Sequence, residues 1–229
     1  MTTSGTFAFN LDLGEVLEEA FERAGGELRS GYDYRTARRS LNLLMLEWQN
    51  RGLNLWTVKS ASQTLTSGVA TYALSAEKLD VVEGMIRTDA GSASSQADIS
   101  MRRVSVTNYA RQTNKLTQGR PIQYYVERTD TGITLNLWPV PDGATTYTFH
   151  YYYMEQIEDA GVNASITQDI PVRFLPCLTA GLAYYLAMKI PEAFVKLPSL
   201  KLIYEDQWDL AANTHREKAG FFLKPSIPK

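Results

Sequence analysis

The sequence has 229 residues, 44% of them hydrophobic and 21% charged, and its formal net charge is −2. This is ordinary globular composition, which excludes a charge-rich disordered chain and supplies apolar material for one large domain or two small ones. The slightly negative balance argues against tight binding of nucleic acid over the whole surface, which normally needs a strong basic excess.

The chain is predicted to begin with an amphipathic helix over residues 13–24, where apolar side chains recur at helical spacing. Asp12 followed by Glu15 has the form of a capping box, and Gly25 ends the run. The opposite face of this helix is acidic. Its carboxylates are Glu15, Glu18, Glu19 and Glu22.

A second helix is predicted over residues 34–51, capped by Asp33 and stopped by Gly52. Its apolar side chains again follow helical spacing and form one inner stripe. We therefore assign residues 1–52 to an N-terminal pair of helices.

Residues 53–158 have a different texture, because Tyr, Thr and Val concentrate in short alternating runs separated by turn signals. They are predicted to form an inserted antiparallel β domain. The runs 55–66 and 69–74 flank Ser67-Gly68 and indicate a hairpin. Further strands are predicted over 81–87, 122–128, 134–138 and 145–154, with a short helix over 106–112.

Helix returns near Asp169, and residues 159–219 are assigned to a C-terminal pair of helices. The stretch from Phe174 is apolar on most sides, so this helix is expected to be central. Pro176 predicts either a kink or a later start of the same helix. The last helix is predicted over residues 199–219.

The predicted fold class is therefore α+β: a four-helix bundle with an inserted antiparallel β domain and an extended C-terminal arm over residues 220–229. The bundle follows from the fact that each of the four helices has an apolar stripe and no other long partner.

No group of catalytic or metal-ligating residues is predicted. His150 and His215 lack a partner at the one-turn spacing of a metal site, and Cys177 lies in an apolar helix, where a buried inert thiol is the expectation. Gly25-Gly26 follows a helix instead of opening one, so it does not form a phosphate loop. We expect no enzyme, no cofactor and no metal.

Two small basic clusters are present, Arg35 with Arg38 and Arg39, and Arg102-Arg103. A solvated or salt-bridged face is the favoured interpretation of each, and contact with phosphate is the alternative.

The C-terminal segment is the clearest candidate for an interaction, since it is apolar, punctuated by proline and too short to build a core. It either folds back on its own helices or docks on a neighbouring subunit, where its prolines would lower the entropy lost on docking. The residues alone favour neither. They are Phe221, Phe222, Leu223, Lys224, Pro225, Ile227 and Pro228.

The sequence shows no basic start followed by an apolar run, as a signal peptide has, and no stretch of about 18 apolar residues that would span a membrane. We expect a soluble protein that is made in the cytosol and has no membrane partner.

Several passages, in the same order along most of the chain, resemble the head-to-tail adaptor proteins of tailed bacteriophages, particularly the tail-completion family of short-tailed viruses. None of them is a catalytic signature, so the specificity lies in their joint order. The passages are residues 37–44 with Glu47-Trp48, Gly119-Arg120-Pro121 leading to Tyr124-Tyr125, residues 137–142 and residues 178–191.

The resemblance implies a structural protein of the virion neck that forms a ring of about twelve copies under the portal. The C-terminal segment of the family reaches onto the portal, and the opposite side of the ring receives the tail nozzle. The β domain would help to seat tail fibres or spikes. Genomic DNA would leave through the central channel without sequence-specific binding.

If the acidic first helix faces that channel, its glutamates would repel DNA phosphates and let the genome slide. Two alternatives stay open: another ring of the neck, such as a stopper or tail terminator of a long-tailed phage, and a virion-associated hydrolase of the cell wall.

Overall fold

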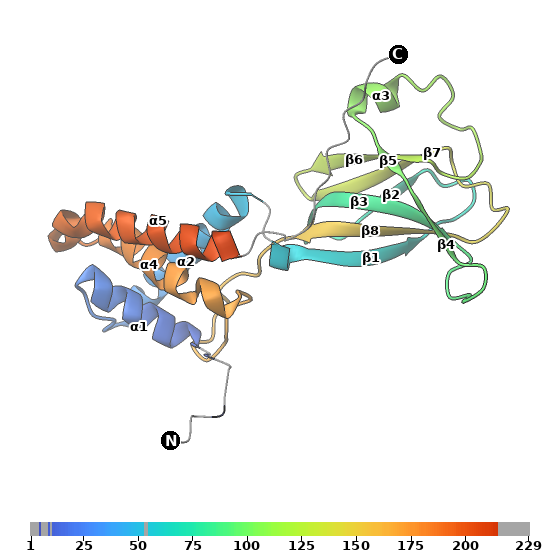
Figure 1. Ribbon diagram of the computed structural model, residues 1–229. Helices are drawn as coiled ribbons and strands as arrows, with labels where there is room; N and C mark the ends of the chain where they lie inside the picture. The colour runs from blue at the N-terminus through green and yellow to red at the C-terminus, as the bar shows by residue number, and fades with distance from the viewer. Residues whose placement is uncertain (1–4, 6–8, 10, 53–54, 215–229) are drawn as a thin grey trace, which may run out of the picture. The chain divides into compact units, whose positions relative to one another are not determined.

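The computed structural model describes residues 5, 9, 11–52 and 55–214. The chain divides into two compact units, which are treated separately below (Figure 1). The helical unit comprises Met1–Leu55 and Ile157–Lys229, and the β unit comprises Trp56–Gln156.

The helical unit begins with α1 (Leu13–Ala24), which has the predicted bounds. Its capping box closes as the sequence indicates: the Glu15 amide donates to Asp12 Oδ1 at 2.9 Å, and the Asp12 amide donates to Glu15 Oε2 at 3.0 Å. Gly25 ends the helix in the left-handed region, at a φ of 90°.

Helix α2 (Gly31–Asn50) begins three residues earlier than predicted. Ser30 is the N-cap, and Asp33 is the N3 partner of a capping box instead of the cap itself. Both residue types cap helices well, so the local pattern did not separate the two positions.

The second half of the helical unit contains two long helices, α4 (Leu175–Ala187) and α5 (Leu197–Thr214). Each follows a short 3₁₀ turn, η2 (Val172–Phe174) before α4 and η3 (Pro191–Lys196) before α5. Pro176 lies in the first turn of α4, so the prediction of a later start is confirmed.

The predicted four-helix bundle is wrong. Helix α4 is the centre of the unit, with nine of its 13 residues buried, and α1, α2 and α5 each pack against it (Figure 1). Helix α1 meets α2 at few positions, so the helices do not surround a shared core as in a bundle. A helix that is apolar on nearly all sides can pack against several helices. Each of those helices then buries its one apolar stripe on the central helix, and no bundle is needed.

The β unit contains two four-stranded sheets, and one short helix lies among the residues described for this unit. The first sheet has the order β1-β8-β3-β4 and the second β2-β7-β6-β5. The strands are β1 (Val58–Thr64), β2 (Thr71–Ala73), β3 (Lys78–Thr88), β4 (Ala97–Ser100), β5 (Arg102–Arg103), β6 (Gln123–Thr129), β7 (Gly132–Trp138) and β8 (Tyr147–Glu155), with η1 (Leu55–Thr57) before β1 and α3 (Val106–Ala110) after β5.

Two expectations about this unit are corrected. The hairpin across Ser67-Gly68 does not form, because β1 pairs with β8 and β2 pairs with β7 in the other sheet. The sheets are also not wholly antiparallel, since β5 and β6 run parallel. The connection that contains α3 supplies the crossover that a parallel pair needs.

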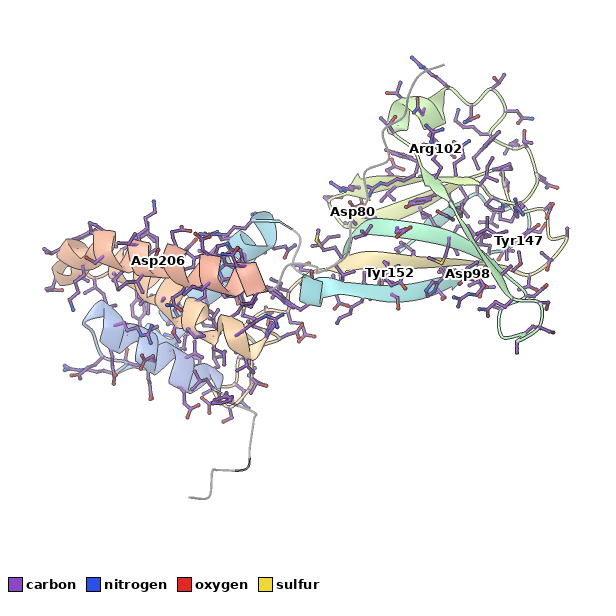
Figure 2. All side chains as sticks on the ribbon, in the orientation of Figure 1. Asp80, Asp98, Arg102, Tyr147, Tyr152 and Asp206 are labelled. Carbon is purple, nitrogen blue, oxygen red and sulfur yellow. The ribbon has the colours of Figure 1, made fainter. Side chains whose placement is uncertain are left out.

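The core of the β unit is rich in aromatic rings from β8. Tyr147, Phe149, Tyr151 and Tyr153 alternate into the core, as the two-residue period of a strand requires. Tyr152, between them, is exposed on the outer face; Figure 2 labels it and Tyr147 on the same strand.

Candidate assembly surfaces

The acidic face of α1 is held on a rigid, well-packed helix. The buried stripe of α1 packs on α4, which leaves the carboxylates on the outside. Glu19 pairs with Arg23 at 2.7 Å. The other carboxylates of this face are Glu15, Glu18 and Glu22, all exposed.

These glutamates border a groove between α1 and the start of α4. The other lining residues are largely apolar. Leu11 lies just before α1, whereas a distant part of the chain supplies Val172, Leu175, Pro176 and Thr179. The structure thus brings the predicted glutamates together on one surface, while their role as channel lining stays a prediction.

A partly buried polar cluster joins α2, α4 and α5. The Glu47 carboxylate accepts hydrogen bonds from the hydroxyls of Tyr185, at 2.7 Å, and Tyr204, at 3.1 Å. Arg51 binds Glu47 within α2 and Glu205 across to α5, the latter at 2.8 Å. One carboxylate therefore has contacts on three helices.

The pKa shifts in this cluster follow from burial and these contacts. Burial and the hydrogen bond to Glu47 raise the pKa of Tyr185 to about 12. The hydrogen bond from Arg51 lowers the pKa of Glu205. For Arg51 burial acts to lower the pKa, but the bonds to Glu205 and Glu47 outweigh it and raise the pKa. At neutral pH Arg51 and Glu205 are therefore ionised and Tyr185 is neutral, so the ion pair between α2 and α5 holds as a structural brace does.

Two of the residues considered for chemistry lie in the described part of the chain, Cys177 in the helical unit and His150 in the β unit. Cys177 is buried in α4, and burial raises the pKa of its thiol to about 12, so little thiolate forms at neutral pH. His150 Nδ1 lies 2.9 Å from Ser62 Oγ on the outer face of the first sheet. His215 lies outside the described residues.

Each of the two basic clusters has one arginine that binds another group of the same chain. Arg38 donates to the Gly161 carbonyl at 3.0 Å, and Arg103 pairs with Asp80 at 2.8 Å. Arg35 and Arg39, by contrast, make no ion pair among residues 11–52 and 55–214.

The predicted portal-binding residues fall beyond the part of the chain that the structure describes. They are Phe221, Phe222, Leu223, Lys224, Pro225, Ile227 and Pro228. Within the described part, no cluster of three His, Cys, Asp or Glu side chains is placed to hold a metal ion. No described helix is long and apolar enough to span a membrane.

Sequence reasoning did not find the outward apolar side chains of α2 and α5. Leu43 and Leu46 on α2, and Leu202 and Leu210 on α5, are exposed although the inner stripes of both helices are filled by other residues. The sequence does show apolar residues at the outer positions of both helices. Because the bundle prediction packed all four helices against one another, it gave no reason to distinguish outer apolar residues from inner ones.

These features define a protein of two units with an acidic face on α1 and exposed apolar side chains on α2 and α5. The model of the SU10 adaptor protein family matches residues 11–218, and the chain belongs to this family. It is thus a structural adaptor protein of bacteriophages, and the resemblance to phage adaptors is confirmed. No curated protein matches the sequence.

Proposed function

We propose that this protein is the head-to-tail adaptor of a short-tailed phage. It would form a ring of about twelve copies between the portal and the tail nozzle, complete the head and surround the path by which DNA leaves. The observation that carries the proposal is the family match, which extends through both units from residue 11 to residue 218.

The C-terminal segment would attach the ring to the portal. Residues 221–228 combine two phenylalanines, a leucine and an isoleucine with prolines and one lysine. Such a segment buries apolar area on a partner, and its prolines reduce the entropy lost on docking. Because the portal would bind only the docked form, ring formation would be favoured on the portal over free solution.

The acidic face of α1 would line the DNA channel. Its support is the exposure of Glu15, Glu18 and Glu22 on a helix whose inner side is packed on α4. Fixed negative charge repels phosphates and prevents the genome from adhering to the wall. Changing these glutamates to lysine should therefore slow genome ejection, whereas Glu127→Lys on exposed β6 should not. Unchanged ejection in the α1 variant would remove this role.

The proposal is tested by the mass of the protein alone and with the portal protein of the same virus, measured by light scattering. The full chain should join the portal as a ring of about twelve. A form that ends at Gly220 should not. If neither form binds the portal, the adaptor function fails, and a stopper or tail-terminator role becomes the one to test. If both bind alike, the adaptor function stands and the docking role of residues 221–228 fails.

A further inference from the structure

Helix α2 carries a stripe of outward side chains that the described residues of one subunit leave uncovered. Tyr32 is 64% exposed and Leu43 56%, and both lie on the side of α2 opposite the buried Leu41 and Trp48. The stripe follows spacings of three and four residues, so its members lie in one line on the helix. We call it the α2 face: Tyr32, Arg35, Arg39, Leu43 and Leu46.

Helix α5 carries a second stripe of this kind. Leu202 is 64% exposed and Leu210 63%, while Leu200, Tyr204 and Ala211 fill the inner side of the helix. Two carboxylates lie in the same stripe, and Figure 2 labels one of them, Asp206. We call it the α5 face: Leu202, Ile203, Asp206, Asp209 and Leu210.

The two faces carry opposite charge. Arg35 and Arg39 on the α2 face, and Asp206 and Asp209 on the α5 face, make no ion pair with any residue that the structure describes. The charge of Arg39 also contributes, after burial, to a lowered pKa of the nearby Lys189. Each face is therefore apolar with charge of one sign, and the other face has the complementary sign.

The order of residues on the two faces also matches when the helices run antiparallel. From Arg35 to Leu43 α2 rises about 12 Å, and α5 rises by the same length from Leu202 to Leu210. In the antiparallel order Leu43 lies beside Leu202 and Arg39 beside Asp206, while Arg35 lies beside Leu210 and next to Asp209. In the parallel order over the same length, Arg35 would lie beside Leu202, away from the aspartates.

We propose that the α2 face of one subunit docks antiparallel on the α5 face of the next copy of the same chain. This inference rests on the proposed function, because a closed ring needs a head-to-tail contact between two different faces. The two faces lie on different helices, so one subunit engages two neighbours at once. The brace between these helices, formed by Glu47, Arg51 and Glu205, belongs to neither face.

A contact of this kind is weak between two isolated subunits. A single pair of helix faces is smaller than the roughly 800 Å² per partner of a standard stable interface. Exposed ion pairs add only about 0–1 kcal/mol each. Stable assembly therefore needs many such contacts in a closed ring, which agrees with assembly on the portal.

The test reverses the charge of one face at a time. One variant carries Arg35→Glu with Arg39→Glu, and the other carries Asp206→Arg with Asp209→Arg. Each variant alone should fail to form a ring on the portal, because like charges then face each other. An equimolar mixture should restore the ring with the two variants alternating, which an even number of about twelve copies allows.

The matched control applies the same charge change to exposed arginines of the β unit, Arg102→Glu with Arg111→Glu; Figure 2 labels Arg102 on β5. This variant should form rings as the unchanged protein does. Far-ultraviolet circular dichroism confirms that each variant is folded. Rings from either single variant, or no ring from the mixture, would overturn the inference.

A second measurement separates this inference from the adaptor function, since it needs no portal. A chain with Leu43→Cys and Leu202→Cys, oxidised at high protein concentration, should give a ladder of disulfide-linked oligomers, because Cys177 is buried. Leu43→Cys with Leu116→Cys, exposed in the β unit, should not. No ladder from the first pair contradicts the proposed contact, even if the unchanged chain joins the portal.

Discussion

Gly84, in the middle of β3, is a position at which one added methyl group should lower the free energy of unfolding. A Cβ at this position would lie 2.6 Å from Phe149 Cε2, closer still to its Cζ, and 3.2 Å from Tyr124 Cε1. Phe149 is fully buried, with Tyr124 at 5.3 Å and Tyr151 at 5.1 Å between ring centroids. Because the ring is buried between these two neighbours, Gly84→Ala requires Phe149 or the strands beside it to shift.

Two opposing effects decide the size of the change. Overpacking of a buried core costs about 1–3 kcal/mol. Replacing a strand glycine by alanine returns roughly 0.5–1 kcal/mol through the lower entropy of the unfolded chain. We expect a net loss of about 1–2 kcal/mol, measured as a lower urea midpoint, with faster hydrogen exchange of the β3 and β8 amides.

Gly119→Ala is the matched control, because its Cβ would meet only Pro139, at 3.6 and 3.8 Å, which are ordinary contact distances. It should change stability by less than about 0.5 kcal/mol. Shortening the opposing ring should also relieve the clash, so Phe149→Leu with Gly84→Ala should cost less than the sum of the two single changes. Additive losses, or a Gly84→Ala protein as stable as the control, would refute this reasoning.

Three further predictions concern the helical unit. Asp12→Ala, which removes the acceptor for the Glu15 amide, should lower the free energy of unfolding by about 1 kcal/mol, whereas Glu22→Ala, on the same helix but without a cap, should have little effect in the same urea titration. Leu182→Ala at a fully buried position of α4 should cost about 2–5 kcal/mol, and Leu202→Ala on the α5 face should be near neutral in the monomer; equal costs would contradict the assignment of the two sides. The pKa of Tyr185 is raised from 10 to about 12 in the folded state, so its contribution to the free energy of unfolding is complete below pH 10 and is lost as the pH rises through 12. Tyr185→Phe should therefore flatten the fall in the free energy of unfolding measured over that pH range.

Local signals account for what could be predicted from the sequence. The bounds of α1 follow from the adjacent Asp12 and Glu15 and from Gly25, which act within one helical turn. The β8 strand follows from the two-residue alternation of its aromatic residues, which holds whatever strands lie beside it.

The errors concern choices of partner, which local patterns do not determine. Ser67-Gly68 makes a turn whether the flanking strands pair with each other or enter different sheets, as they do here. Likewise, an apolar stripe on a helix specifies burial without specifying the covering helix, so one central α4 replaced the bundle. The groove beside Glu15 could not be predicted for the same reason, because two of its lining residues, Val172 and Leu175, are distant from Glu15 in sequence.

The brace between α2 and α5 would set the angle between the two proposed contact faces, and hence the number of subunits in the ring. A ring of about twelve turns the chain by about 30° at each contact, so a small change of this angle alters the number. Glu205→Ala removes the tie from Arg51 to α5 while Arg51 keeps Glu47, so no buried charge is left unpaired. We expect rings of mixed size from this variant under native mass spectrometry, with little loss of stability, since the pair is partly exposed. Lys201→Ala, exposed on α5 and outside the brace, should keep one ring size, and a single unchanged size for Glu205→Ala would show that the angle is set elsewhere.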